Sequence, residues 1–294
     1  MGGKRPIVAI NTLAFHGYPL DTALGEIARL ADYVEPVFIT KYDPTLREEY
    51  FNEDNARAFS RRLEQLRLKI VSMGSHMDLG QSDAATIFRN RMEFAAKIGA
   101  KTIITNAGHK SCKTTFYKNM GKLISYAEKI DITIAFENPG DGQDLLLGDG
   151  IEAIEVLERL GSDRARFNYD FSNVFTYSKG KKYPGQELGR LLPYIGHLHL
   201  KNVKLWKGHW MVCSIGKGVI NYRNLFQQFP ALLNIPMSIE LPIGYGYDDQ
   251  FNFALRKESP ELNENFTAPP IEYIRKVLSS SLRFYEINLR LSRR

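Results

Sequence analysis

Cysteine is scarce in this 294-residue sequence: only Cys112 and Cys213 are present, far apart and in no CxxC motif. The chain therefore lacks a disulfide framework, and its cysteine count fits a reducing compartment. Long apolar runs are missing as well, so no segment is expected to span a membrane. The first residues, MGGKRPIVAIN, contain neither an apolar signal region nor a cleavage site. We therefore expect a cytoplasmic protein without a membrane partner.

A strong excess of one charge is also missing. The 39 Lys and Arg residues are balanced by 33 Asp and Glu residues, which leaves a net charge of +6. The tightest basic clusters are short, at 179–182 and at Arg290, Arg293 and Arg294. A solvated surface explains such short clusters better than a nucleic-acid site does, so no nucleic-acid partner is expected.

What the sequence does contain is a regular alternation of apolar strand-like segments and amphipathic helical segments, which is typical of a mainly parallel sheet. Eight such units follow one another without a linker. We therefore predict one α/β domain over residues 1–294, a single (β/α)8 TIM barrel, for which about 250 residues are typical. A doubly wound open sheet is the alternative, but no GxGxxG motif follows the first strand. The expected strands are 7–13, 33–39, 69–75, 101–106, 132–137, 166–171, 195–201 and 235–241, and the expected helices are 20–32, 53–67, 83–99, 114–129, 149–160, 221–229 and 269–290, with a weaker pattern at 186–192.

Single positions indicate where some of these elements begin and end. Asp21 and Asp149 are expected N-caps, and Gly99 is expected to end a helix before the next strand. Three connections on the C-terminal side of the predicted barrel are unusually long, and we expect them to form loops that cover a substrate. These connections are 172–187, 203–218 and 243–268.

Four of the strand-like segments end on a carboxylate or an imidazole, at Glu137, Asp170, His199 and Glu240. Residues two apart share a face of a strand, and each time the large apolar residues lie on the face opposite to the ligand-type residue. Catalytic groups converge at the C-terminal strand ends of a parallel barrel. Two Glu, one Asp and one His form a normal ligand set for a divalent cation. Ordinary acidic residues at strand ends are the alternative, but four with the same parity argue against it.

Other polar residues are candidates for contact with a substrate, and for each of them simple packing or a place at the barrel rim is the alternative. His197 is expected one layer below His199, in a supporting role. Glu35 ends an early strand, where its carboxylate can bind a hydroxyl group or pair with a cation. The candidate substrate-binding residues are His16, His76, Asn106, His109, Asn173, Lys201 and Trp206.

Several motifs carry a family resemblance. They are E-N at Glu137–Asn138, D-x-x-N at Asp170–Asn173, H-x-K at His199–Lys201 and the final Glu240, together with GKGVIN at 216–221 and EFAAKIGAKTII at 93–104. With these motifs the chain resembles the xylose isomerase-like TIM barrel superfamily, the sugar isomerase and epimerase group that includes ketose 3-epimerases. The resemblance covers nearly the whole chain.

The resemblance implies one divalent metal ion bound by Glu137, Asp170, His199 and Glu240, with Mn²⁺, Mg²⁺ or Co²⁺ favoured and Zn²⁺ as an alternative. It also implies a carbohydrate or sugar-derived substrate and proton abstraction next to a carbonyl through an enediolate. Glu137 and Glu240 would be the catalytic acid/base pair as well as ligands. A homo-oligomer is compatible with the resemblance.

The sequence departs from its relatives at two positions. Asn173 stands where many relatives have a His, and its amide can bind a substrate hydroxyl but is a poor metal ligand. Asn106 stands where the endonuclease branch has a metal-binding His, and the downstream D-x-H pair of that branch is missing. An abasic-site endonuclease is therefore disfavoured. Two alternatives stay open: a metal-dependent lyase or dehydratase, and a non-catalytic barrel that binds a small molecule.

Overall fold

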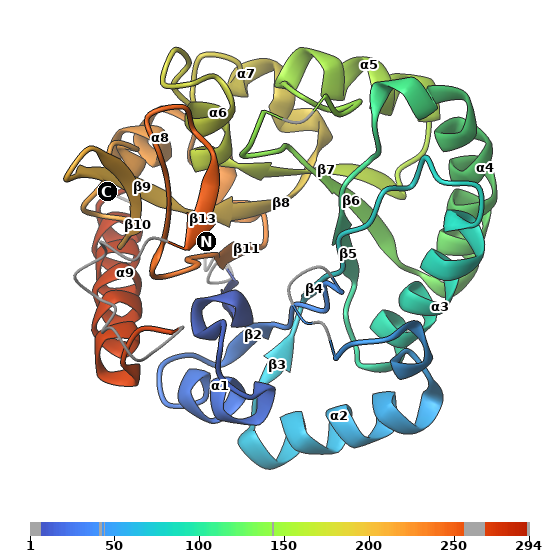
Figure 1. The fold of residues 1–294 in the computed structure, drawn as a ribbon, viewed down its shortest axis with the longest axis horizontal. Coiled ribbons are helices and arrows are strands. Elements are labelled where there is room, and N and C mark those ends of the chain that lie inside the picture. The colour runs from blue at the N-terminus through green and yellow to red at the C-terminus, as the bar shows by residue number, and fades with distance from the viewer. Residues whose placement is uncertain (1–6, 41–42, 44, 143, 256–267, 293–294) are drawn as a thin grey trace.

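The computed structural model describes residues 7–40, 43, 45–142, 144–255 and 268–292. Its main feature is a nine-stranded parallel sheet that curves into a nearly closed barrel with helices around it (Figure 1). The order of the strands is β3-β2-β1-β11-β8-β7-β6-β5-β4. Their bounds are β1 Val8–Asn11, β2 Tyr33–Glu35, β3 Lys69–Ile70, β4 Ser72–Gly74, β5 Thr102–Thr105, β6 Thr133–Glu137, β7 Ala165–Asp170, β8 Ile195–Leu200 and β11 Met237–Ile239.

The predicted TIM barrel is thus confirmed, with its third strand divided in two. Only Val71 separates β3 from β4, and these two strands lie at opposite ends of the strand order. A parallel bridge between Val37 and Gly74 connects the end of β2 to β4. The continuous segment 69–74 therefore forms backbone hydrogen bonds with both neighbouring strands, β2 and β5, and joins the two edges of the sheet.

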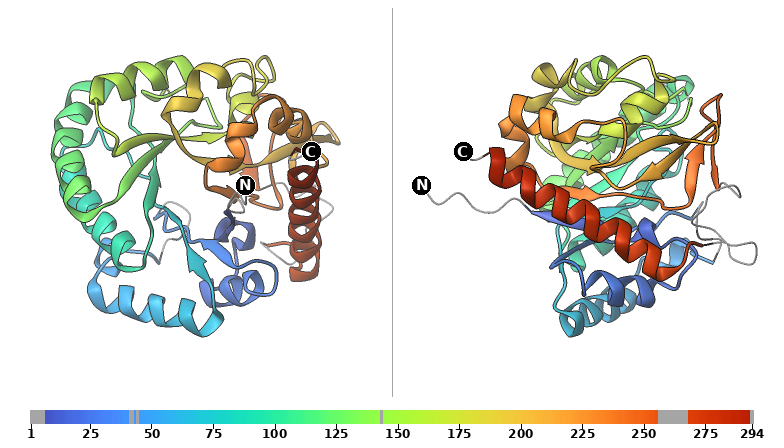
Figure 2. Two further views of the ribbon diagram at one scale, coloured as in Figure 1. Left: turned by 180° about the vertical axis from the view of Figure 1, so that it is seen from behind. Right: turned by 90° about the vertical axis from the view of Figure 1, so that its left-hand side faces the viewer.

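Helices alternate with the barrel strands and lie outside them (Figure 2). Outward-facing side chains of the strands pack against these helices; the rings of Phe136 in β6 and Phe116 in α4, for example, have centroids 5.7 Å apart. The helices are α1 Leu20–Ile27, α2 Glu53–Leu66, α3 Ala84–Lys97, α4 Lys113–Ile130, α5 Gly150–Leu160, α6 Phe171–Tyr177, α7 Leu188–Leu191, α8 Tyr222–Gln228 and α9 Ile271–Ser292, and short 3-10 turns occupy Thr12–Phe15, Glu48–Tyr50, Lys110–Cys112, Leu192–Tyr194 and Pro230–Asn234. No helix within the described ranges is long and apolar enough to cross a lipid bilayer.

Two of the three expected helix boundaries are confirmed. The Asp149 side chain caps α5, because its carboxylate accepts the amides of Ile151 and Glu152 at 3.1 and 3.0 Å. Gly99 follows α3 with a φ of +91°, a left-handed conformation that favours glycine. The prediction for Asp21 is wrong: Pro19 precedes the first turn of α1, and Asp21 lies within that turn, where it pairs with Arg62.

The long connections are more regular than expected. Residues 172–187 begin with most of α6, and the other two connections contribute strands to a second, four-stranded antiparallel sheet of order β13-β12-β10-β9. This small sheet stands beside the C-terminal ends of the barrel strands (Figure 2). These parts are therefore helix and strand rather than loops alone, and their role as a substrate cover stays a prediction; 256–267 of the third connection lie outside the described residues. The strands are β9 Asn202–Trp206, β10 His209–Cys213, β12 Tyr245–Tyr247 and β13 Phe253–Leu255.

Candidate metal centre and its cavity

The barrel brings the four predicted ligands together. Glu137 ends β6, Asp170 ends β7, His199 is the fifth residue of β8, and Glu240 directly follows β11. These four strands are neighbours in the barrel wall. Each residue offers one ligand atom, and the four atoms all lie within 4.8 Å of one another. All four residues are buried, with at most 6% of their surface exposed.

Two positively charged or protonatable side chains contact this group of carboxylates. The Nδ1 atom of His199 lies 3.2 Å from Glu137 Oε1 and 3.5 Å from Glu240 Oε2. The Nζ atom of Lys201 lies 2.7 Å from Asp170 Oδ2 and 3.0 Å from Glu240 Oε2. Three carboxylates out of contact with water need positive charge nearby. Since three carboxylates and one imidazole are also typical ligands of a hard divalent cation, these residues fit a metal ion.

The pKa values of the carboxyl groups reflect the same balance. Burial and the neighbouring Glu240 raise the pKa of Glu137, but the charge and hydrogen bond of His199, together with the hydrogen bond of His76, outweigh both and bring it to about 2. Burial also opposes ionisation of Glu240, yet Lys201 and His199 hold its pKa well below the usual range. Burial raises the pKa of Asp170 to about 7, because attraction to Lys201 offsets only part of the burial. Asp170 is therefore the carboxylate whose negative charge is least well compensated.

The two asparagines of the sequence motifs hold the ligand-bearing strand ends in place. Asn138 donates to the Asp170 carbonyl at 3.0 Å and accepts the Asp170 amide at 2.9 Å, so it links the ends of β6 and β7. Asn173 donates to Glu137 Oε1 at 3.2 Å and to the Asn138 carbonyl at 2.8 Å. The Asp170 carboxylate accepts the Asn173 amide at 2.9 Å and thereby caps α6. The E-N and D-x-x-N motifs are thus one connected hydrogen-bond network.

A second polar layer lies below the four ligands. As expected, His197 belongs to this layer: its Nδ1 atom is 2.9 Å from Asn168 Oδ1 and its Nε2 atom is 3.0 Å from Ser72 Oγ. Burial lowers the pKa of His197 to about 4. Glu35 belongs to the same layer: its Oε1 atom lies 2.8 Å from His199 Nε2, and its Oε2 atom accepts the Ser238 hydroxyl at 2.7 Å. The sequence did not predict the contact with His199.

A cavity of about 360 Å³ adjoins the ligand cluster and is lined by two of its members, Glu137 and Glu240. Four of the seven predicted substrate-binding residues line it: His76, Asn106, Asn173 and Lys201. His76 Nε2 lies 3.1 Å from Glu137 Oε2, so this imidazole reaches the proposed catalytic carboxylate directly. The structure adds wall residues that the sequence patterns did not single out, namely Leu13, Ile39, Thr40, Met77, Asp78, Pro139, Gly140, Asp141, Leu145, Pro242, Tyr247 and Phe253.

The other three predicted substrate-binding residues lie outside this cavity. His16 lines a neighbouring cavity, where its Nδ1 atom is 2.6 Å from the Tyr245 hydroxyl. His109 is exposed at the start of the Lys110–Cys112 turn. Trp206 ends β9 at the tip of the β9–β10 hairpin and is 38% exposed.

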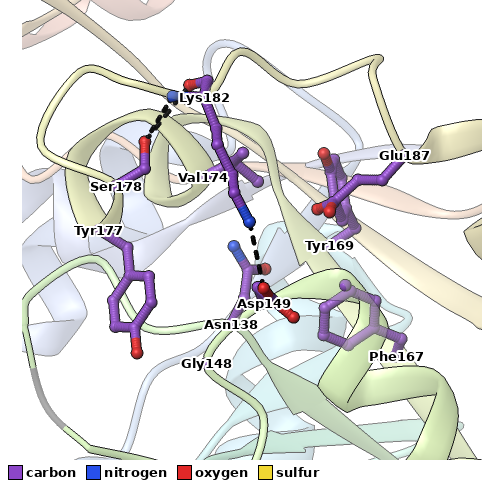
Figure 3. Close-up of a pocket in the computed structure, with 11 residues that line it drawn as sticks. Asn138, Gly148, Asp149, Phe167, Tyr169, Val174, Tyr177, Ser178, Lys182 and Glu187 are labelled. Carbon is purple, nitrogen blue, oxygen red and sulfur yellow. Dashed lines mark hydrogen bonds and ion pairs between the residues drawn. The ribbon is translucent and has the colours of Figure 1, made fainter.

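A second, smaller cavity of about 130 Å³ lies on the other side of Asn138, which lines both cavities. Figure 3 shows Lys182 reaching across it to Asp149, with the Nζ and Oδ2 atoms 3.1 Å apart. Phe167 and Tyr169, outward-facing residues of β7, form part of its wall. The small cavity therefore belongs to the layer between barrel and helices, whereas the larger one is lined by two of the candidate metal ligands, Glu137 and Glu240.

Comparisons with known proteins agree with this fold. The family model of the xylose isomerase-like TIM barrel matches residues 25–257, and the chain belongs to this family. No curated protein sequence matches the chain.

Solved structures that resemble the chain share its fold at low sequence identity. The complex of D-allulose 3-epimerase from Methylomonas sp. with D-allulose is 14% identical, with a TM-score of 0.68 over 97% of this chain and 98% of that one. The probable 3-DHS dehydratase AsbF from Bacillus anthracis is 13% identical, with a TM-score of 0.67 over 95% and 98%. A xylose isomerase-like TIM barrel protein from Mycobacterium smegmatis in complex with magnesium is 18% identical, with a TM-score of 0.62 over 95% and 98%.

Proposed function

We propose that this protein is a metal-dependent sugar isomerase or epimerase that removes a proton from the carbon next to a carbonyl group. The observation that carries the proposal is the pair of buried carboxylates, Glu137 and Glu240, which share one ligand cluster at the floor of a polar cavity. Membership in the xylose isomerase-like family and the fold shared with a D-allulose 3-epimerase support a sugar substrate. A cavity of about 360 Å³ is in the usual range for small-molecule sites.

Glu137, Asp170, His199 and Glu240 would hold one divalent ion, and their many oxygen atoms favour Mn²⁺, Mg²⁺ or Co²⁺ over Zn²⁺. When bound, such an ion polarises a substrate carbonyl and stabilises the negative charge that develops on its oxygen. Lys201 and Asn173 line the same cavity. Lys201 has one N–H group beyond its two ion pairs to donate to a substrate hydroxyl, and the Oδ1 atom of Asn173, which has no hydrogen-bond partner among the described residues, can accept from one. We infer that they orient the sugar above the ligand cluster.

The two glutamates would exchange protons with the substrate. Lys201 and His199 keep Glu240 ionised, so this carboxylate can accept the proton of the C–H bond that breaks. His76 contacts Glu137 and lines the cavity, so it can hold or relay the proton that Glu137 delivers. If a proton returns to the same carbon from the opposite face, the product is an epimer, whereas its return to the neighbouring carbon gives an isomer.

The test is deuterium entry from solvent into the substrate beside its carbonyl, measured across a panel of ketoses with saturating metal. We expect exchange with the wild-type protein and a loss of turnover of about 10²–10⁴-fold in Glu137→Gln and Glu240→Gln, with metal occupancy checked in each. His109→Ala, which changes an exposed residue outside the cavity, is the matched control. Undiminished turnover in both metal-loaded glutamine variants would rule out the acid/base pair.

A lyase or dehydratase is the second candidate, favoured by the fold shared with a probable dehydratase. Such an enzyme would use the same carboxylates to remove the proton and would then expel a leaving group from the neighbouring carbon. Both candidates predict solvent exchange, which a non-catalytic binding protein would not give. Product analysis separates the two enzymes, because elimination releases water and leaves a double bond, while epimerisation conserves the substrate's composition.

A further inference from the structure

Below the candidate metal centre, the carboxylate of Glu35 accepts hydrogen bonds at both of its oxygen atoms. Glu35 ends β2 and is fully buried. Its Oε1 atom accepts the Asn11 amide at 2.6 Å, and its Oε2 atom accepts the hydroxyl of Ser238 at 2.7 Å and that of Ser72. These donors come from β1, β11 and β4, so the Glu35 carboxylate is held from three directions. A buried charge held this firmly keeps its orientation when a neighbouring group moves.

The ring of His199 lies between this carboxylate and the ligand cluster. Its Nε2 atom faces Glu35 Oε1 at 2.8 Å, and its Nδ1 atom faces Glu137 and Glu240 at 3.2 and 3.5 Å. A neutral imidazole has one N–H group and one lone pair. Carboxylates face both nitrogens of His199, and Glu35 makes the closest contact, so the hydrogen is favoured on Nε2. The lone pair is then left on Nδ1, the nitrogen that points to the other ligands.

We propose that Glu35 is a positioning residue, which orients His199 so that Nδ1 binds the ion while Nε2–H is donated to Glu35. This inference rests on the proposed metal-dependent function and extends it to a residue that would not touch the ion. Metal-binding histidines generally donate their second N–H group in this way, and loss of the acceptor typically weakens metal binding by about 10–100-fold.

Two other roles for Glu35 make different predictions. A purely structural carboxylate would stabilise the barrel near the β2–β4 junction through Ser72 without affecting metal affinity. A second ion would use Glu35, His197 and His199, whose ligand atoms also lie within 4.8 Å of one another. That ion would have to displace existing partners, because both nitrogens of His197 already contact Asn168 and Ser72.

The arrangement can be tested in the wild-type protein. We expect ¹¹³Cd²⁺ bound to protein with ¹⁵N-labelled histidine to show cadmium–nitrogen coupling at Nδ1 of His199, with the hydrogen on Nε2. Coupling at Nε2, or a second cadmium ion bound to His197, would overturn the inference while leaving the metal-dependent function intact. Absence of cadmium binding would contradict both.

Variants supply the second readout. Glu35→Gln replaces the charged acceptor of the Nε2–H group with a weaker, neutral carbonyl oxygen, so we expect the Mn²⁺ dissociation constant, measured by calorimetry, to rise by about 10–100-fold. Ser238→Ala is the matched control, since its hydroxyl contacts the same carboxylate but not His199, and its Mn²⁺ affinity should stay close to that of the wild type. A folded Glu35→Gln protein that binds Mn²⁺ as tightly as the wild type would contradict the inference. If Glu35→Gln does not fold, the cadmium coupling in the wild type decides.

Discussion

Two buried tyrosines beside the barrel wall, Tyr169 and Tyr222, differ in what their hydroxyl groups contact. The Tyr222 hydroxyl accepts the Lys201 amide at 2.9 Å and donates to the Lys201 carbonyl at 2.7 Å. Among the described residues, none forms a hydrogen bond of normal geometry with the Tyr169 hydroxyl, although the Gly185 amide approaches it. The two side chains therefore allow a matched comparison of a satisfied and an unsatisfied buried hydroxyl.

We expect Tyr222→Phe to lower the free energy of unfolding by about 1–3 kcal/mol, because it leaves a buried amide and a buried carbonyl without this partner. Tyr169→Phe should leave the free energy of unfolding nearly unchanged or raise it, since no comparable hydrogen bond is lost. Urea denaturation of both variants measures the difference. Equal losses in the two variants would show that the Tyr169 hydroxyl has a partner of similar strength.

An ion pair joins helix α1 to helix α9. Arg275 of α9 binds the carboxylate of Glu26 in α1, whose side chain is only 11% exposed. The hydrogen bond from Arg275 lowers the pKa of Glu26 below 4.5, although burial opposes the shift. Because the folded pKa lies below the unfolded one, the pair stabilises the protein fully above about pH 4.5, and this contribution is lost as the pH falls through the folded pKa.

We therefore expect Glu26→Gln to be less stable than the wild type at pH 7, and the difference to shrink as the pH falls below about 4.5. Chemical denaturation at a series of pH values measures this difference. Glu272→Gln is the matched control, because Glu272 is 80% exposed and lies 4.0 Å from the same arginine. A difference between Glu26→Gln and the wild type that stays constant down to pH 3 would mean that the carboxylate's charge contributes nothing.

Strand periodicity predicted the barrel and the convergence of its strand ends, because both depend on local alternation of apolar and polar residues. It did not predict β9, β10, β12 and β13. Short antiparallel strands over a site bury only part of their side chains, so their sequences show no clear alternation of apolar and polar residues. Val71, which divides the third strand, gave no signal either. Its interruption follows from barrel closure, which involves residues far away in the sequence.

The same distinction applies to the candidate site. The positions of Glu137, Asp170, His199 and Glu240 could be predicted because each one lies at or next to the end of a recognisable strand. The contact between Glu35 and His199 could not, because it depends on the side-chain packing inside the barrel between residues 164 positions apart. Trp206 was misplaced for a related reason: an aromatic residue in a long connection can face a cavity or the solvent, and here the hairpin turns it outward.

The candidate metal centre connects four neighbouring strands of the barrel. The negative charge of its carboxylates explains why a bound ion would stabilise the fold. In the metal-bound state the three carboxylates would be ionised and carry a charge of −3, which Lys201 reduces to −2. A divalent ion that takes the place of the His199 proton would neutralise the remainder. An ion that binds only the folded state stabilises it by an amount that rises with the logarithm of the free ion concentration, about 2.7 kcal/mol at 100 times the dissociation constant. We therefore expect Mn²⁺ to raise the melting temperature of the wild-type protein and a chelator to reverse the rise.

The variants Asp170→Asn and Asn173→Ala test whether this stabilisation comes from the proposed ligands. Asp170→Asn keeps an oxygen to cap α6 but removes one ligand charge, so we expect both the Mn²⁺-dependent rise in melting temperature and the bound metal to be lost. Asn173→Ala removes an amide that contacts Glu137 without being a proposed ligand, and the rise and one bound ion should remain. Elemental analysis of the purified proteins checks occupancy independently of activity. One full equivalent of metal in Asp170→Asn would exclude this site, and three ions in the wild type would instead support the endonuclease alternative.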